Sequence, residues 1–114
     1  MKWHDRFKWA FSGLVHALKC ERNLQIHFAA GVVVLILAFA FRFEYMEKLI
    51  LLIIIGAVIS LELVNTAIER TVDLVSEEFH PLAKRAKDVA AAAVLIFTII
   101  AVITGIAMFV HHFM

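Results

Sequence analysis

Three long runs of apolar residues divide the chain, and polar segments separate them. The runs cover residues 28–43, 48–68 and 89–110. A helix needs roughly 20 apolar residues to cross the hydrocarbon core of a bilayer. The second and third runs meet this length, and Ile26 and His27 could extend the first. No run alternates as a strand does, and only helices or closed barrels pair all their backbone groups in lipid, so the pattern predicts three transmembrane helices.

The polar connections indicate how these spans are joined. Residues 42–48, RFEYMEK, are short enough for a tight turn between antiparallel helices. The connection over residues 70–88 is longer and contains His80-Pro81. Proline is well tolerated in the first turn of a helix, where its missing N–H would have no partner. We therefore expect the third spanning helix to begin near Pro81 and to continue into the membrane.

Residues 3–22 follow a different pattern, with apolar and charged positions separated at helical spacing. A helix with aromatic residues on one face and cations on the other is typical of the membrane interface. An amphipathic helix packed on a soluble core would show the same pattern, but no soluble domain follows here, so we expect an interfacial helix. The apolar positions are Trp3, Phe7, Phe11, Leu14, Val15 and Leu18, and the polar ones are Lys2, Asp5, Arg6, Lys8, Lys19 and Arg22.

Composition places these elements in one membrane domain. The 114 residues are 63% hydrophobic, whereas a soluble domain is roughly 45–50% apolar. A domain of this size has too much surface to bury so many apolar residues in its own core. The net charge of +1 gives no reason to expect nucleic acid as a partner. We expect a single all-α membrane domain over residues 1–114.

The distribution of lysine and arginine predicts the orientation of this domain. Cytoplasmic segments carry an excess of these residues. They are frequent before residue 23 and in the connection over 69–88, sparse in the short turn, and absent after Val110. We expect the N-terminus and the 69–88 connection to be cytoplasmic and the short turn and C-terminus to face outside.

A stripe of polar residues follows the second apolar run, in the stretch ELVNTAIE and just beyond it. At about 100° per residue, Glu62, Asn65, Thr66, Glu69 and Asp73 fall on one helix face. Charged residues at membrane depth are costly and usually mark functional sites. Asp73 could equally be a solvated residue, Thr66 could bond its own helix, and Asn65 could join two helices. Glu62 is the deepest of the five and therefore the best candidate for a proton acceptor near neutral pH.

A second acid and a cation complete the pattern. Glu69 lies two turns further out and could share a divalent metal with another carboxylate, for which Glu21 is a candidate unless it is a surface residue. Lys84, Lys87, Asp88 and Ala91 share one face of the third helix, although Lys84 could simply anchor the helix at the membrane surface. Magnesium and a phosphate donor would explain paired acids beside a lysine. The chain nevertheless has no P-loop and none of the soluble kinase motifs.

The stretches ELVNTAIE and HPLAKRAKDVAAAAVL resemble the small integral-membrane diacylglycerol kinase family of bacteria. The resemblance is nearest to the Gram-positive branch of undecaprenol kinases, in which ERN..IH and HPLAK..KD also recur. It implies a homotrimer in the bacterial cell membrane, with active sites at the cytoplasmic interface and shared between neighbouring subunits. ATP would donate its γ-phosphate to a lipid hydroxyl.

The same resemblance assigns roles to individual residues. Glu62 matches the catalytic base, and Glu62 and Ala91 are the residues expected to bind the lipid alcohol. Glu21 and Glu69 match the acids that hold Mg²⁺ with ATP. The nucleotide-binding residues would be Glu21, Asn65, Glu69, Glu78, Phe79, His80, Lys87 and Asp88.

Two departures from the family pattern bear on the substrate. The Gram-negative branch has Glu where this chain has His27 and Tyr where it has Phe79. The first difference favours a polyprenol such as undecaprenol over diacylglycerol, which stays the alternative. The second difference removes the tyrosine hydroxyl, so that Phe79 could contact the nucleotide only by stacking. A different class also remains open, a small oligomeric transporter in which Glu62 carries protons or cations.

Overall fold

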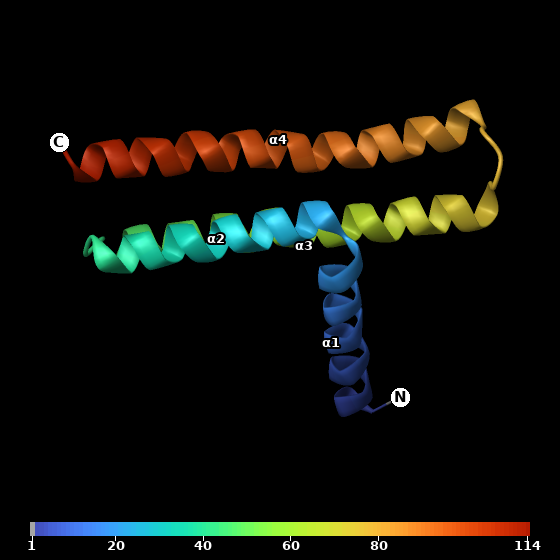
Figure 1. Cartoon of the computed structure of the whole chain (residues 1–114), viewed down its shortest axis with the longest axis horizontal. Helices are drawn as coiled ribbons and strands as arrows, with labels where there is room; N and C mark the ends of the chain where they lie inside the picture. Colours follow the sequence, from blue (N-terminus) through green and yellow to red (C-terminus); the bar gives the residue numbers. More distant parts are fainter. Residues whose placement is uncertain (1) are drawn as a thin grey trace.

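The structure is a computed structural model that describes residues 2–114, and these residues form four helices and no strand. The helices are α1 (Trp3–Cys20), α2 (Arg22–Ala40), α3 (Tyr45–Val75) and α4 (Pro81–His112) (Figure 1). By length and composition, α2, α3 and α4 can each cross a membrane. The prediction of an all-α protein with three candidate spans is confirmed.

The ends of α2 differ from the predicted span of residues 28–43. The helix begins at Arg22, because the polar residues before the apolar run are also helical. It ends at Ala40, so that the last three residues of the predicted span lie in the turn instead. Arg42 has a φ of 58°, the left-handed conformation that commonly ends a helix. Phe43 follows it and is buried.

Local signals define the starts of α3 and α4. A capping box formed by Glu44 and Glu47 begins α3, and the Glu44 N–H donates to Glu47 Oε1 at 3.0 Å. Pro81 occupies the first turn of α4, and the Leu82 N–H donates to Nδ1 of His80 at 3.1 Å. The expectation that the third spanning helix begins at Pro81 is therefore confirmed.

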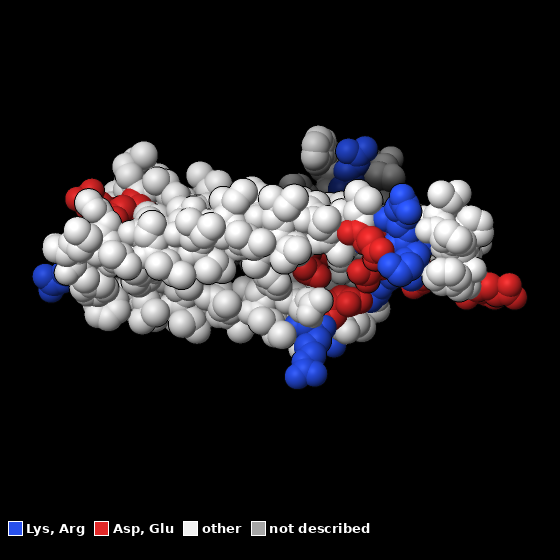
Figure 2. Space-filling model, turned by 90° about the horizontal axis from the view of Figure 1, so that it is seen from above, with Lys and Arg blue, Asp and Glu red and all other residues white. Residues whose placement is uncertain are grey.

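The longest helices extend beyond the thickness of a bilayer. α3 has 31 residues and α4 has 32, so each is roughly 45–50 Å long at 1.5 Å per residue, against about 30 Å of hydrocarbon. Figure 2 shows a long body without charge and a concentration of charged side chains toward the α3–α4 connection. The polar stripe of α3 lies at this charged end.

The helices pack around α3. Both α2 and α4 contact it, and α1 contacts α2 and α3. α1 stands roughly perpendicular to the other three helices and joins them near the start of α2 (Figure 1). Gly31 lets α2 approach α3 closely, since a Cβ atom there would lie 2.5 Å from Cγ2 of Ile55. At the opposite end, the Phe43 ring packs against Phe109 and His112, with centroids 4.6 and 4.4 Å apart.

Candidate active site

The polar residues that α3 buries belong to the predicted stripe. Glu62 is 5% exposed, and Asn65 and Thr66 are each 7% exposed. Glu69 is half-buried, and Asp73, one turn further along, is exposed. Burial therefore decreases along the stripe toward the α3–α4 connection, as the apolar run before Glu62 indicates.

A cavity of about 300 Å³ brings three members of the stripe together with α2 and α4. Glu62, Asn65 and Glu69 form its α3 wall. Ala91 lies opposite them on α4, which places this predicted substrate-binding residue in the same cavity. The remaining lining residues are Asn23 and His27 of α2, and Val94, Leu95 and Thr98 of α4.

The polar groups in this cavity interact with one another. Asn65 Nδ2 donates a hydrogen bond of 3.0 Å to Glu69 Oε1. Asn65 Oδ1 is buried and has no hydrogen-bond partner. The Glu62 carboxylate interacts electrostatically with His27, Glu69 and Glu21. The cavity thus combines a deep carboxylate, a shallower carboxylate and an amide oxygen with a free acceptor site.

Glu21 lies outside the cavity lining, at the junction of α1 and α2. Arg70 of α3 holds it there, since Nη2 donates to Glu21 Oε1 at 2.8 Å and Nη1 donates to His16 Nε2 at 2.6 Å. Within residues 2–114, no group of three or more His, Cys, Asp or Glu side chains is arranged to hold a metal. Mg²⁺ commonly takes one or two carboxylates plus the phosphates of a substrate. The oxygens of Glu69 and Asn65 fit that smaller donor set.

Apart from Asn65 and Glu69, the predicted nucleotide-binding residues lie at the charged end but outside the cavity lining. Lys87 pairs with Asp73 and so ties α4 to α3. Asp88 accepts from Lys84 Nζ at 2.6 Å along α4. In the α3–α4 connection, Glu78, Phe79 and His80 are all exposed. The ring of His80 also caps α4, a structural role that the sequence pattern did not indicate.

Several cavity residues were not among the sequence predictions. Asn23, His27 and Thr98 line it, although only His27 had been noted, as a departure from the family pattern. Thr98 carried a signal, because it is an isolated hydroxyl in a long apolar run. No sequence pattern indicated a role for Arg70, because its contact with Glu21 joins residues far apart in the sequence.

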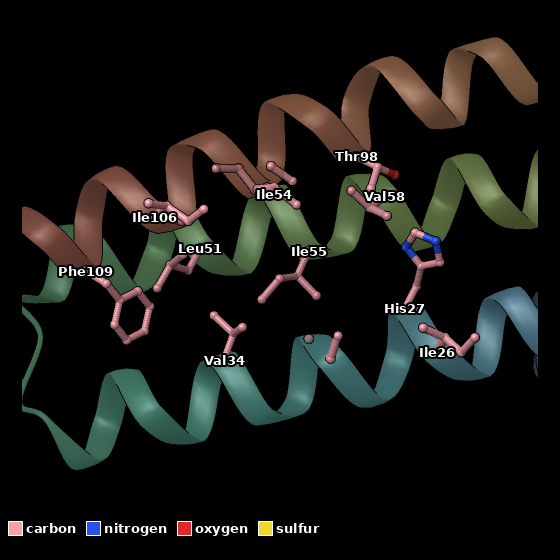
Figure 3. A pocket seen from close by; sticks show the side chains of 15 residues that line it. Ile26, His27, Val34, Leu51, Ile54, Ile55, Val58, Thr98, Ile106 and Phe109 are labelled. Carbon is pink, nitrogen blue, oxygen red and sulfur yellow. The ribbon is translucent and has the colours of Figure 1, made fainter.

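A larger apolar groove of about 610 Å³ adjoins this cavity. It lies between α2, α3 and α4, and His27 and Thr98 line both spaces. Figure 3 shows these two side chains at one end of the groove and Phe109 at the other, with aliphatic side chains between them. The buried carboxylate of Glu62 therefore lies at the polar end of a long apolar space.

Comparisons with known proteins identify the family of this chain. The family profile of prokaryotic diacylglycerol kinase matches residues 8–109. The undecaprenol kinase of Bacillus subtilis (strain 168) is 47% identical over 103 residues, covering 90% of this chain and 84% of that protein. The diacylglycerol kinase of Synechocystis sp. (strain ATCC 27184 / PCC 6803 / Kazusa) is 43% identical over 100 residues, covering 87% of this chain and 57% of its own. The diacylglycerol kinase of Escherichia coli (strain K12) is 32% identical over 105 residues, covering 92% of this chain and 86% of that protein.

These matches cover nearly the whole chain, including the cavity and both signature stretches. The relatives are named as lipid kinases. The choice between an enzyme and a transporter is thereby decided in favour of the enzyme. The chain belongs to the prokaryotic diacylglycerol kinase family and is a membrane lipid kinase.

Proposed function

We propose that the protein transfers the γ-phosphate of ATP to the hydroxyl of undecaprenol, giving undecaprenyl phosphate. The observation that carries this proposal is the position of Glu62, a buried carboxylate where a polar cavity meets a long apolar groove. A lipid alcohol needs both spaces, one for its hydroxyl and one for its chain. The 47% identity to an undecaprenol kinase supports the choice of lipid.

Glu62 acts as the general base in this proposal. Its carboxylate accepts the proton of the lipid hydroxyl as the hydroxyl oxygen attacks the γ-phosphorus. The bond between that phosphorus and the β,γ-bridging oxygen breaks, and ADP leaves. Ala91 has a small side chain, which leaves room for the alcohol opposite Glu62.

Glu69, Asn65 and Glu21 would hold Mg²⁺ together with the phosphates of ATP. The metal would supply the positive charge that neutralises the phosphate oxygens. Lys87, Asp88 and the exposed residues Glu78, Phe79 and His80 would bind the remainder of the nucleotide. These last five residues lie in the α3–α4 connection or the first turns of α4, and none of them lines the Glu62 cavity.

The separation of these groups supports a site shared between copies of the chain. Glu21 is held by Arg70 and does not line the cavity that contains Glu69. Lys87 and Asp88 are also outside it. In a homotrimer, a neighbouring subunit would supply the Glu21 or the Lys87-Asp88 part of each site. The cytoplasmic face would hold these sites, because lysine and arginine are concentrated there.

The test is a phosphorylation assay with radiolabelled ATP and the purified protein. Undecaprenol, diacylglycerol and a lipid-free control are compared singly, and the two lipids are then made to compete. We expect label in undecaprenyl phosphate, with undecaprenol suppressing labelling of diacylglycerol at equal concentration. Preferential labelling of diacylglycerol would favour the activity by which the Synechocystis and Escherichia coli relatives are named.

A further inference from the structure

Two buried polar atoms in the Glu62 cavity have no hydrogen-bond partner. Among residues 2–114, the side-chain atoms in this condition are Asn65 Oδ1 and Thr98 Oγ1. Both residues line the cavity, and Asn65 is only 7% exposed. Leaving a buried polar atom unpaired is costly. Ligands that bring a polar partner to each of these two atoms would remove that cost.

Thr98 is unusual in not satisfying its own hydroxyl. A threonine in a helix often donates to the carbonyl four residues before it, and Thr71 does so, with Oγ1 at 2.7 Å from the Ala67 oxygen. Thr98 makes no such bond, although its Oγ1 is buried. Its hydroxyl is therefore available to donate to a ligand and to accept from one.

The apolar groove begins at Thr98 and His27 and has room for a chain. Ala101 and Gly105 line it, and the methyl group of the one and the missing side chain of the other leave space between the helices. Its volume of about 610 Å³ lies within the usual range for small-molecule sites. Figure 3 shows that the groove is polar only at the end where Thr98 and His27 lie.

We propose that Thr98 and His27 recognise the acceptor alcohol, holding its hydroxyl beside Glu62 while its single apolar chain lies in the groove between α2, α3 and α4. This inference rests on the proposed function and adds to it a specificity-determining hydroxyl, Thr98. The ligand class is a long-chain primary alcohol. A chain with a hydroxyl at one end matches the groove and cavity together.

A helix from a second copy is the other apolar occupant to consider. Its side chains could fill the groove but would leave Thr98 Oγ1 without a partner. A ligand with a hydroxyl head supplies an acceptor for the Thr98 O–H and donates its own proton to Glu62, and Asn65 Oδ1 stays free for the metal of the proposed function. The continuity of the two spaces through His27 and Thr98 also favours one ligand that occupies both.

The first experiment replaces Thr98 by valine, which keeps the shape and removes the hydroxyl. We expect KM for undecaprenol to rise about tenfold, since a hydrogen bond to the alcohol is lost, while KM for ATP stays within about twofold. Thr98→Ser should restore the wild-type value. Thr104→Val is the control, because Thr104 lies on the same helix and lines neither space. Equal lipid KM values for the two valine variants would overturn the role of Thr98.

The second experiment fills the groove two turns further along α4. Gly105 lines the groove, and a Cβ atom there meets no heavy atom within 4 Å, so that Gly105→Leu places its side chain in the space meant for the lipid. KM for undecaprenol should rise about tenfold, and KM for geraniol, whose short chain reaches only the polar end, should change less. Gly56→Leu is the matched control, since Gly56 also has open space but lines neither cavity.

The outcomes separate this inference from the function on which it rests. A wild-type protein that phosphorylates no lipid alcohol overturns both. A wild-type protein that phosphorylates undecaprenol, with variants that match their controls, overturns only the recognition site. If Gly105→Leu changes the size of the assembly and leaves both alcohol KM values unchanged, the groove holds a neighbouring subunit instead of lipid.

Discussion

At the scale of single residues, Glu62 is the carboxylate most isolated from water. It is 5% exposed, and no lysine or arginine pairs with it among the ion pairs of residues 2–114. Its ionisable neighbours are His27, Glu69 and Glu21. A buried carboxylate without a lysine or arginine partner is costly to maintain, so its place beside the apolar groove points to a use in catalysis.

Glu62→Gln should abolish most of the turnover. The amide has nearly the same shape but takes up no proton, and a general base contributes about 10²–10⁴-fold to a rate. We expect kcat for lipid phosphorylation to fall by at least about 100-fold, with binding of ATP retained. Kinetic assays and a nucleotide-binding measurement on the same preparation check this.

Glu47→Gln is a suitable control for that experiment. It makes the same change on the same helix, at the opposite end, and an amide oxygen can still accept the Glu44 N–H. Its kcat should equal that of the wild type. A Glu62→Gln enzyme with wild-type kcat would remove the base from the proposal and leave the buried carboxylate as a structural feature.

Residue spacing predicted part of the cavity and could not predict the rest. Glu62, Asn65 and Glu69 recur at helical intervals, and the structure places them on one wall. Thr98 of α4 and Asn23 of α2 line the same cavity. Their positions depend on how the three helices pack, which residue spacing within one helix does not reveal. The Arg70–Glu21 ion pair also spans distant segments, so no local pattern indicates it.

At the scale of the elements, the contact between α2 and α3 depends on a glycine. A methyl group on Gly31 would lie 2.5 Å from Cγ2 of Ile55, and the β-branched side chain of Ile55 has little freedom to move away. We expect Gly31→Ala to lower the free energy of unfolding by about 1–3 kcal/mol. Thermal unfolding in detergent micelles measures the change.

Gly13→Ala provides the comparison for this substitution. No heavy atom lies within 4 Å of the position that its Cβ would take. Alanine is the better residue inside a helix by roughly 0.5–1 kcal/mol, so this variant should unfold at the same temperature or slightly higher. Equal unfolding temperatures for Gly31→Ala and the wild type would show that α2 and α3 can move apart without a loss of stability.

The orientation of α1 makes its position in the membrane testable. If the other helices cross the bilayer, a helix roughly perpendicular to them lies along its surface (Figure 1). Trp3 and Trp9, the two tryptophans of the chain, are both on α1 and both exposed. We expect lipids brominated near the headgroup to quench their fluorescence more than lipids brominated near the chain end. Equal emission with and without brominated lipid would place α1 outside the interface.

The helices themselves could be predicted with more success than their ends. Apolar runs indicated three spans, and His80-Pro81 indicated the start of α4. The predicted end of the first span, residue 43, was wrong, because Phe41 and Phe43 continue the apolar run although α2 ends at Ala40. The left-handed conformation of Arg42 is set by the turn into α3, which no hydrophobic pattern reveals.

At the scale of the whole molecule, charge is distributed unevenly along the bundle. The middle of the body is free of charge, and acids and cations are concentrated toward the α3–α4 connection, with a smaller charged group at the opposite end (Figure 2). The proposed site, the residues proposed to bind nucleotide, and α1 all lie toward the α3–α4 connection. We propose from the positive-inside tendency that this end faces the cytoplasm, where ATP is available.

The single cysteine tests this orientation directly. Cys20 is exposed and lies at the charged end, at the last residue of α1. A membrane-impermeant maleimide should therefore leave Cys20 unlabelled in intact cells and label it after permeabilisation. The variant Cys20→Ser with Met114→Cys moves the thiol to the other end of the bundle and should be labelled in intact cells. Labelling of Cys20 in intact cells, with protection of position 114, would reverse the orientation and separate the proposed site from the supply of ATP.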